Sequence, residues 1–124
     1  MRLKFIFGSV ECVAEVDEEK APLTVEAIKK HLPIKGVVSR WGDEIYFETP
    51  VKLSTDENSK EIVEEGDVAF WIPGRAICLF FGKTPISDDK IRPASAVNVF
   101  GKIKENLNLL KEIKSGTKVV VQVD

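Results

Sequence analysis

The chain is poor in the residues from which catalytic and metal sites are most often built. Its 124 residues include one histidine, His31, and two cysteines, Cys12 and Cys78, which lie far apart in the sequence. No Cys/His spacing typical of zinc sites occurs, and His31 at a predicted helix end gives no Ser-His-Asp or Cys-His set. The glycines are spaced as punctuation between strands, not as a phosphate-binding loop. We therefore expect no metal and no cofactor.

Long hydrophobic runs and a strong net charge are also missing. No apolar segment approaches the roughly 20 residues of a membrane span. Acidic residues follow the N-terminal MRLKFIFGSVEC before a signal-peptide core could form. The net charge of -2 argues against a dedicated nucleic-acid-binding protein. These features predict a protein with neither a membrane nor a nucleic-acid partner.

What remains is the composition of a globular protein, with 44% hydrophobic and 31% charged residues. A chain of this length is expected to form a single domain, residues 1–124. Both cysteines stand in alternating apolar contexts, which predicts buried, reduced thiols in a cytoplasmic protein, with a disulfide as the alternative. Many Lys and Glu residues, a single Gln and a single Met are typical of a thermophile.

The charge is distributed unevenly along the chain. Residues 1–65 carry 9 basic and 14 acidic residues, a net charge of -5, whereas residues 66–124 carry 9 and 6, a net charge of +3. The asymmetry indicates either solvated surface or a pocket that prefers anions.

Alternation of apolar and polar residues predicts strands. Apolar residues that recur every three or four positions predict two helices. Residues 3–7 and 10–16 alternate on either side of Gly8-Ser9, and a two-residue loop that begins with glycine is typical of a type II′ hairpin turn. The first helix is expected to follow with Thr24 as its N-cap, preceded by Leu23 as part of a hydrophobic staple.

Five further strands are predicted at residues 34–41, 44–49, 67–72, 76–81 and 95–100, followed by a second helix at about 104–113 and a last strand at 118–123. The order is therefore β-β-α-β-β-β-β-β-α-β. Many short strands and few helices indicate a sandwich or a barrel. A closed barrel leaves no edge strand, and its two open ends can each be covered by a helix. We predict a mainly β protein, a closed eight-stranded antiparallel barrel capped by two helices.

This order of elements resembles that of the cyclophilin fold, and Ile72-Pro73-Gly74 with Cys78 four residues on resembles a run in the middle of cyclophilins. Other segments resemble a family of small bacterial and archaeal proteins with a cyclophilin-like fold and no assigned function. These segments are Trp41-Gly42-Asp43-Glu44-Ile45-Tyr46-Phe47, Gly66-Asp67-Val68, Phe81-Gly82-Lys83-Thr84-Pro85 and Pro93-Ala94-Ser95-Ala96-Val97-Asn98-Val99. The resemblance spans nearly the whole chain and implies a cyclophilin-like barrel.

The resemblance to true cyclophilins does not extend to their catalytic run. Prolyl isomerases place an arginine two residues before the Ile-Pro-Gly, and Phe70 occupies that position here. They also carry Gln-Gly-Gly after the cysteine, where Leu79-Phe80-Phe81-Gly82 follows Cys78. The arginine is thought to hydrogen-bond the prolyl amide, so isomerase activity is implied only if Arg75 or Arg92 is brought over the groove instead.

A ligand groove is predicted near residues 71–95. Aromatic walls with a few polar groups are typical of small-molecule sites, and arginine can hold a carboxylate or phosphate through two parallel hydrogen bonds. Glu44 beside Trp41 is a candidate buried carboxyl with a raised pKa. The candidate ligand-binding residues are Trp41, Glu44, Tyr46, Trp71, Arg75, Phe80, Phe81, Lys83, Thr84, Ser87, Asp88, Arg92 and Ser95.

Three functions remain open, and the sequence favours the first. The chain is predicted to be a binding module for a small anionic ligand or a peptide. The alternatives are a peptidyl-prolyl isomerase with a displaced arginine, and a structural protein that forms a homodimer through exposed aromatics. Core packing is the other interpretation of the aromatics, because alternation allows only one of the adjacent Phe80 and Phe81 to point into the barrel. Phe70 and Trp71 pose the same question.

Overall fold

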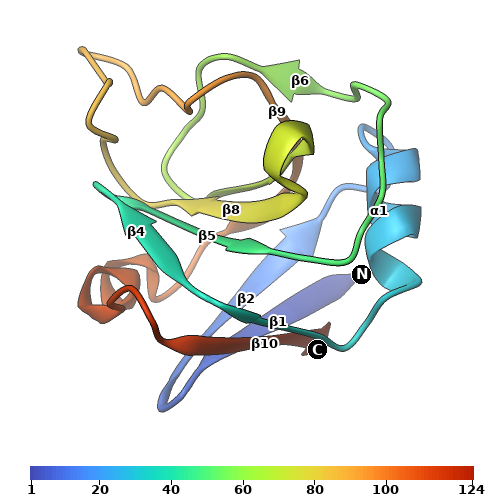
Figure 1. The fold of residues 1–124 in the computed structure, drawn as a ribbon, viewed down its shortest axis with the longest axis horizontal. Coiled ribbons are helices and arrows are strands. Elements are labelled where there is room, and N and C mark those ends of the chain that lie inside the picture. The colour runs from blue at the N-terminus through green and yellow to red at the C-terminus, as the bar shows by residue number, and fades with distance from the viewer.

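Ten β-strands, one α-helix and two 3-10 helices make up the computed structural model, which describes all 124 residues. In chain order the elements are β1 (Arg2–Phe7), β2 (Val10–Val16), α1 (Pro22–Lys29), β3 (Ile34–Val37), β4 (Ser39–Trp41), β5 (Glu44–Glu48), β6 (Ser59–Lys60), β7 (Asp67–Trp71), η1 (Ile72–Gly74), β8 (Ala76–Phe80), β9 (Val97–Ile103), η2 (Leu107–Glu112) and β10 (Lys118–Val123). Nine strands pair in the order β3-β10-β1-β2-β9-β7-β8-β5-β4, and β6 pairs with β9 (Figure 1).

The sheet curls into a nearly closed barrel because residues 34–41 belong to both of its edges. β3 pairs with β10 and β4 pairs with β5, and Val38 joins the two. The mainly β barrel predicted from the sequence is confirmed, but the number of strands is ten and not eight. The predicted strand 34–41 is divided at Val38, whose N–H donates to the carbonyl of Thr117 at 2.8 Å, and the short β6 is an addition.

The β1–β2 hairpin forms as the sequence predicts. Phe7 pairs with Val10, so the loop is Gly8-Ser9. Gly8 has a φ of +66°, which glycine adopts without the steric cost that a Cβ would bring. The strong local signal therefore fixed both the position and the register of this pair.

The interior of the barrel is filled by a cluster of 24 buried residues, and a second cluster of 6 lies on the outer face of β7 and β8. The adjacent aromatics are divided between the two, as alternation requires. Phe70 and Phe81 belong to the interior cluster, whereas Trp71 and Phe80 face outward. Phe80 is nevertheless fully buried, because the outer cluster also contains Val63 and Val97.

The helix α1 lies at one side of the barrel (Figure 1). Its first turn is capped by Glu57, from a loop distant in the sequence. The helix begins at Pro22, earlier than predicted, so Thr24 is not its N-cap, and Leu23 is 53% exposed instead of packing as a staple. The carboxylate of Glu57 accepts hydrogen bonds from the backbone N–H of Leu23 at 3.0 Å and of Thr24 at 2.7 Å. It also accepts one from the Thr24 hydroxyl at 2.8 Å.

Replacing Glu57 with alanine should therefore lower the free energy of unfolding by about 1 kcal/mol, because two helix N–H groups lose a charged acceptor. Desolvation opposes these hydrogen bonds, but on balance they lower the pKa of Glu57 from its ordinary value of 4.5. Its contribution is thus present above pH 4.5 and is lost as the pH falls. Urea denaturation at pH 7 and pH 3 checks both statements, with Glu26→Ala on the exposed side of α1 as the control.

The second predicted helix is a six-residue 3-10 helix, η2, and not an α-helix over 104–113. Asn106 immediately before it has a φ of +61°, and a left-handed residue at this point prevents an α-helix from starting at 104. Arg40 stabilises the other end of η2, where its Nη1 donates to the carbonyl of Ile113 at 2.8 Å. The element still lies at the side of the barrel opposite α1 (Figure 1).

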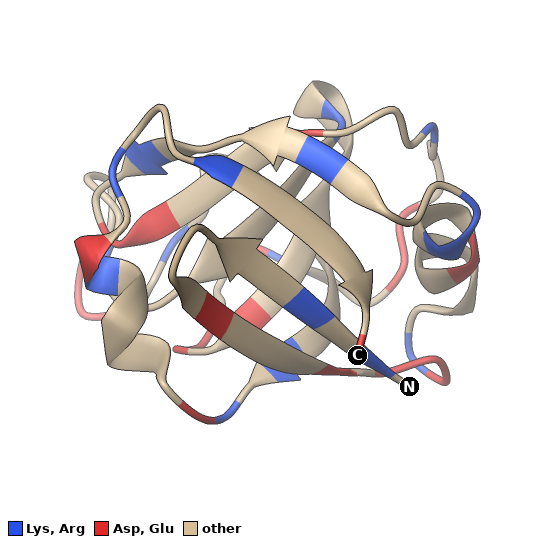
Figure 2. Ribbon diagram, turned by 90° about the horizontal axis from the view of Figure 1, so that it is seen from below, with Lys and Arg blue, Asp and Glu red and all other residues tan.

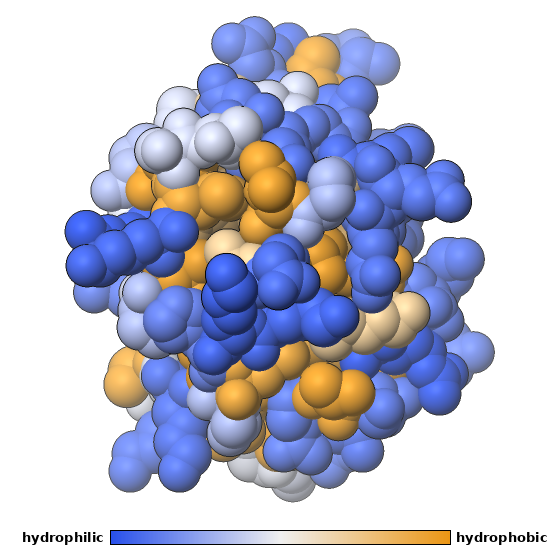
Figure 3. All heavy atoms as spheres, turned by 90° about the vertical axis from the view of Figure 1, so that its right-hand side faces the viewer, coloured by the Kyte–Doolittle hydropathy of each residue, from blue (hydrophilic) through white to orange (hydrophobic).

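Charges of both signs are mixed over the surface, although the two halves of the sequence differ in net charge (Figure 2). The Nζ atom of Lys4 on β1 lies 3.8 Å from Oε1 of Glu11 and 3.6 Å from Oδ1 of Asp124. The Nη2 atom of Arg2 lies 3.1 Å from Oδ2 of Asp124. On the face that carries α1, apolar side chains are bordered and crossed by hydrophilic ones (Figure 3). No helix has the length and apolar character needed to cross a bilayer.

Candidate functional site

The candidate site lies on the outer wall of the barrel, where β5, β8 and β7 run side by side. Because successive side chains of a strand point to opposite faces, Ile45 and Phe47 of β5 fill the interior while Glu44 and Tyr46 face outward. Tyr46 pairs with Cys78 of β8, which faces outward too. These outward side chains line a pocket.

The pocket has a volume of about 130 Å³ and is mainly apolar. Trp41 and Trp71 lie on its walls with Tyr46, and residues 93–97 complete it. Its lining residues are Trp41, Glu44, Tyr46, Trp71, Cys78, Pro93, Ala94 and Val97. The chain has two tryptophans and one tyrosine, and all three line this pocket, while the barrel interior uses phenylalanine.

Glu44 is the one charged residue in this lining, and it is 5% exposed. Its Oε1 atom is buried and has no hydrogen-bond partner within the protein. Burial raises the pKa of Glu44 to about 7, and the neighbouring thiol of Cys78 acts in the opposite direction. Burial, together with the charge of Glu44, raises the pKa of Cys78 well above its ordinary value, so this thiol is a poor nucleophile.

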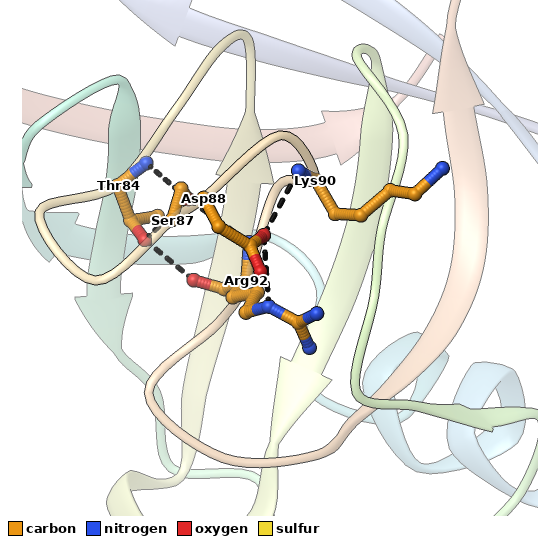
Figure 4. Close-up of polar contacts among 5 residues, drawn as sticks. All are labelled: Thr84, Ser87, Asp88, Lys90 and Arg92. Atoms are coloured by element: carbon orange, nitrogen blue, oxygen red, sulfur yellow. Dashed lines mark hydrogen bonds and ion pairs between the residues drawn. The ribbon is translucent and has the colours of Figure 1, made fainter.

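The residues from 82 to 96 form a folded segment, and not a plain linker, and Pro93 and Ala94 of this segment line the pocket. Figure 4 shows the polar contacts within the segment. Ser87 is its centre, since its Oγ accepts hydrogen bonds from the backbone N–H of Thr84 at 2.9 Å and of Arg92 at 3.0 Å. The Thr84 hydroxyl donates to the carbonyl of Arg92. Asp88 accepts from the Arg92 side chain at 3.0 Å and from the backbone of Lys90 at 2.9 Å.

Replacing Ser87 with alanine should remove the shared acceptor of this segment. We expect a loss of about 1–2 kcal/mol in the free energy of unfolding, because the N–H of the buried Thr84 would be left without a partner. Amide hydrogen exchange of residues 84–92 should accelerate, while the ranking of exchange rates among the amides of the barrel strands should stay the same. Ser54→Ala, at an exposed position, serves as the control; equal effects of the two substitutions would contradict the role given to Ser87.

Two contacts tie this segment to the rest of the chain, one to the wall strand β7 and one to the loop before it. The Nε1 atom of Trp71 donates to the Ser95 hydroxyl at 2.7 Å, and the N–H of Val63 donates to the carbonyl of Ile91 at 3.0 Å. The first contact fixes one wall of the pocket to the chain that closes it. Trp71 is therefore positioned by the strand β7 on one side and by Ser95 on the other.

The structure brings together four of the residues predicted to bind a ligand, namely Trp41, Glu44, Tyr46 and Trp71, and links Ser95 to them. The remaining ones lie elsewhere. Phe80 and Phe81 are buried in the two clusters, Arg75 and Lys83 are exposed outside the pocket, and Thr84, Ser87, Asp88 and Arg92 stabilise the folded segment. Their roles in binding stay predictions.

No arginine lines the pocket. Arg75 ends η1 in a left-handed conformation, with a φ of +48°, and its carbonyl accepts hydrogen bonds from Thr49. Arg92 is paired with Asp88, and this hydrogen bond lowers the pKa of Asp88 to about 2. Neither arginine is therefore part of the pocket lining.

Sequence reasoning missed four lining residues, Cys78, Pro93, Ala94 and Val97. The sequence predicts a buried, reduced thiol at Cys78, which the structure confirms, but not that this thiol also lines the pocket. The alternation of Cys78 with Ile77 and Leu79, which face the interior, was the signal that could have placed it on the outer wall beside Tyr46. Both cysteines are unpaired and buried.

The geometry thus defines a nearly closed antiparallel β-barrel with a small aromatic pocket on its outer wall. A family model described as cyclophilin-like matches residues 1–122, and the chain belongs to the cyclophilin-like family. It is 61% identical to the hypothetical protein AF2241 from Archaeoglobus fulgidus, whose solution structure superposes with a TM-score of 0.86 over 100% of this chain and 95% of that one.

A more distant solved structure is that of McbB in complex with tryptophan. It is 15% identical, with a TM-score of 0.78 over 98% of this chain and 44% of that one. At this identity the likeness shows a shared fold and nothing more. A comparison with curated proteins gave no match.

Proposed function

We propose that this protein is a binding module that holds a small organic ligand, or one side chain of a peptide, in the pocket between β4, β5, β7 and residues 93–97. The observation that carries the proposal is the buried Oε1 atom of Glu44, which has no hydrogen-bond partner within the protein. A buried polar atom without a partner is costly and rare in folded proteins. A ligand that donates a hydrogen bond to it would remove that cost.

The rest of the pocket supports the same proposal. Ligand sites are mostly apolar and aromatic, with a few polar groups that fix orientation, and here the polar group is a single carboxyl among three aromatic side chains. With no arginine at the pocket, a binding role has more support than prolyl isomerisation. Two buried, unpaired cysteines fit a reducing compartment, and a cytoplasmic location is part of this proposal.

Titration of ¹⁵N-labelled protein with three probes tests the proposal. Benzylamine, benzyl alcohol and benzoate share one ring and differ in the polar group that they carry. Binding of any of them should shift the indole N–H signals of Trp41 and Trp71, which Trp41→Phe and Trp71→Phe assign. Indole signals that stay fixed with all three probes would contradict the proposed function, and shifts confined to other residues would do the same.

A further inference from the structure

We propose that the group seated against Glu44 is an ammonium ion carried on a small apolar body. This inference rests on the proposed function and names its ligand class. The pocket lining contains one carboxyl and no basic side chain, so its charge favours a cation over the anion expected from Arg75 and Arg92. An N–H of the ammonium would donate to Oε1, the atom that lacks a partner, in a charge-assisted hydrogen bond.

The aromatic walls favour the same ligand. The face of a tryptophan or tyrosine ring carries negative electrostatic potential and attracts a cation that lies over it, more strongly when the site is shielded from water. Trp41, Trp71 and Tyr46 line the pocket together with Glu44. An anion would meet both these rings and a carboxylate, and it would have no donor with a positive charge.

The volume limits the ligand to about one ring or a short alkyl chain. The pocket measures about 130 Å³, close to the roughly 150 Å³ of an engineered apolar cavity that binds benzene. The body of the amine would therefore lie between the aromatic side chains and Pro93, Ala94 and Val97. Larger groups attached to it would extend past the rim.

Binding should be coupled to pH through Glu44. The other titratable groups that line the pocket are Tyr46 on the same strand and Cys78 on β8; β4, β7 and residues 93–97 contribute none. Since the pKa of Glu44 is about 7 in the free protein, the carboxyl is mostly protonated at pH 6 and mostly ionised at pH 8. A cationic ligand prefers the ionised form, so its affinity should rise about tenfold over this range.

The test is a set of binding titrations with benzylamine, benzyl alcohol and benzoate between pH 6 and pH 8, where benzylamine stays protonated. Intrinsic fluorescence reports binding directly, because both tryptophans line the pocket. We expect benzylamine to bind at least tenfold more tightly than either other probe at pH 8. Glu44→Gln should remove this preference and the pH dependence. Glu48→Gln, at an exposed position on the same strand outside the pocket, should retain both.

Different results would overturn the ammonium ligand and the binding function. If benzyl alcohol or benzoate binds at the indoles as tightly as benzylamine, or if Glu44→Gln binds benzylamine with unchanged affinity, the ammonium inference is overturned while the binding function stands. If no probe moves the indole signals, the proposed function itself is overturned.

A second comparison distinguishes a free amine from the lysine side chain of a peptide. Butylamine and Nα-acetyl-lysine N-methylamide present the same alkylammonium, with and without a peptide backbone. Tighter binding of the lysine derivative would assign the ligand to a peptide, and equal or tighter binding of butylamine would assign it to a free small molecule. Either assignment holds only if Glu44→Gln weakens binding of the probe. If the substitution leaves the affinity for both probes unchanged, the ammonium inference is overturned.

Discussion

Replacing Glu44 with glutamine should raise the free energy of unfolding by about 3 kcal/mol at pH 8 and change it little at pH 4. The side chain is 5% exposed, and burial raises its pKa from 4.5 to about 7. Ionising this carboxyl is therefore harder in the folded protein than in the unfolded chain. Glutamine has nearly the same shape and no charge, so it removes the cost of burying the ionised form.

The direction of the pH dependence follows from which state holds the proton. Between pH 4.5 and pH 7 the folded protein keeps a proton on Glu44 that the unfolded chain has released, so this group makes stability fall as the pH rises. Above pH 7 both states are ionised and the difference is constant. The effect is opposite in sign to that of Asp88, whose lowered pKa makes stability fall as the pH decreases below its ordinary value of 3.8.

Urea denaturation of the wild type, Glu44→Gln and Glu48→Gln at several pH values from 4 to 8 measures this difference. Contributions from Asp88, Glu57 and the remaining groups are common to all three proteins and cancel when the curves are subtracted. The Glu48→Gln curve should run parallel to the wild type. A Glu44→Gln curve that also runs parallel to the wild type would show that Glu44 titrates near its ordinary pKa, and it would remove the basis for a pH-coupled ligand.

The barrel could be predicted because its signals are local. A two-residue period and a glycine turn define the hairpin of residues 3–16 without any knowledge of the rest of the chain. The division of residues 34–41 at Val38 could not be predicted, because it depends on β10 and β5 reaching that segment from opposite sides. The type of η2 was missed for a similar reason, since an apolar period places an element on the core but does not distinguish a 3-10 turn from an α-helix.

The residues that line the pocket could be predicted in part. Those close together in the sequence could be predicted, and those brought in from distant segments could not. Trp41, Glu44 and Tyr46 are close in sequence, and alternation puts the last two on one face of β5. Pro93 and Val97 join them only because the segment 82–96 folds through Ser87 and is held by Ser95. Arg75 and Arg92 were predicted to bind a ligand because a guanidinium can hold an anion. Their positions depend on the turns around them, which the sequence pattern does not describe.

Replacing Gly66 with alanine should cost about 4 kcal/mol, a larger loss than we expect from any other substitution considered for this protein. Gly66 has a φ of +93°, and a Cβ at this position would lie 2.4 Å from the carbonyl oxygen of Ile103. Backbone atoms must move to relieve such a contact. The same residue links three strands, since its N–H donates to Phe80 and its carbonyl accepts from Ile103, both at 2.7 Å.

Gly116→Ala provides a control that separates the two causes. Gly116 has a φ of +94°, but no atom lies within 4 Å of the position that a Cβ would take. This substitution carries the cost of a left-handed alanine alone, about 1 kcal/mol. The difference between the two variants in urea denaturation therefore measures the close approach of β9 to the start of β7. Equal losses would mean that the backbone around Gly66 and Ile103 shifts at little cost to make room for the Cβ. The two hydrogen bonds of Gly66 would then not hold this part of the backbone rigidly.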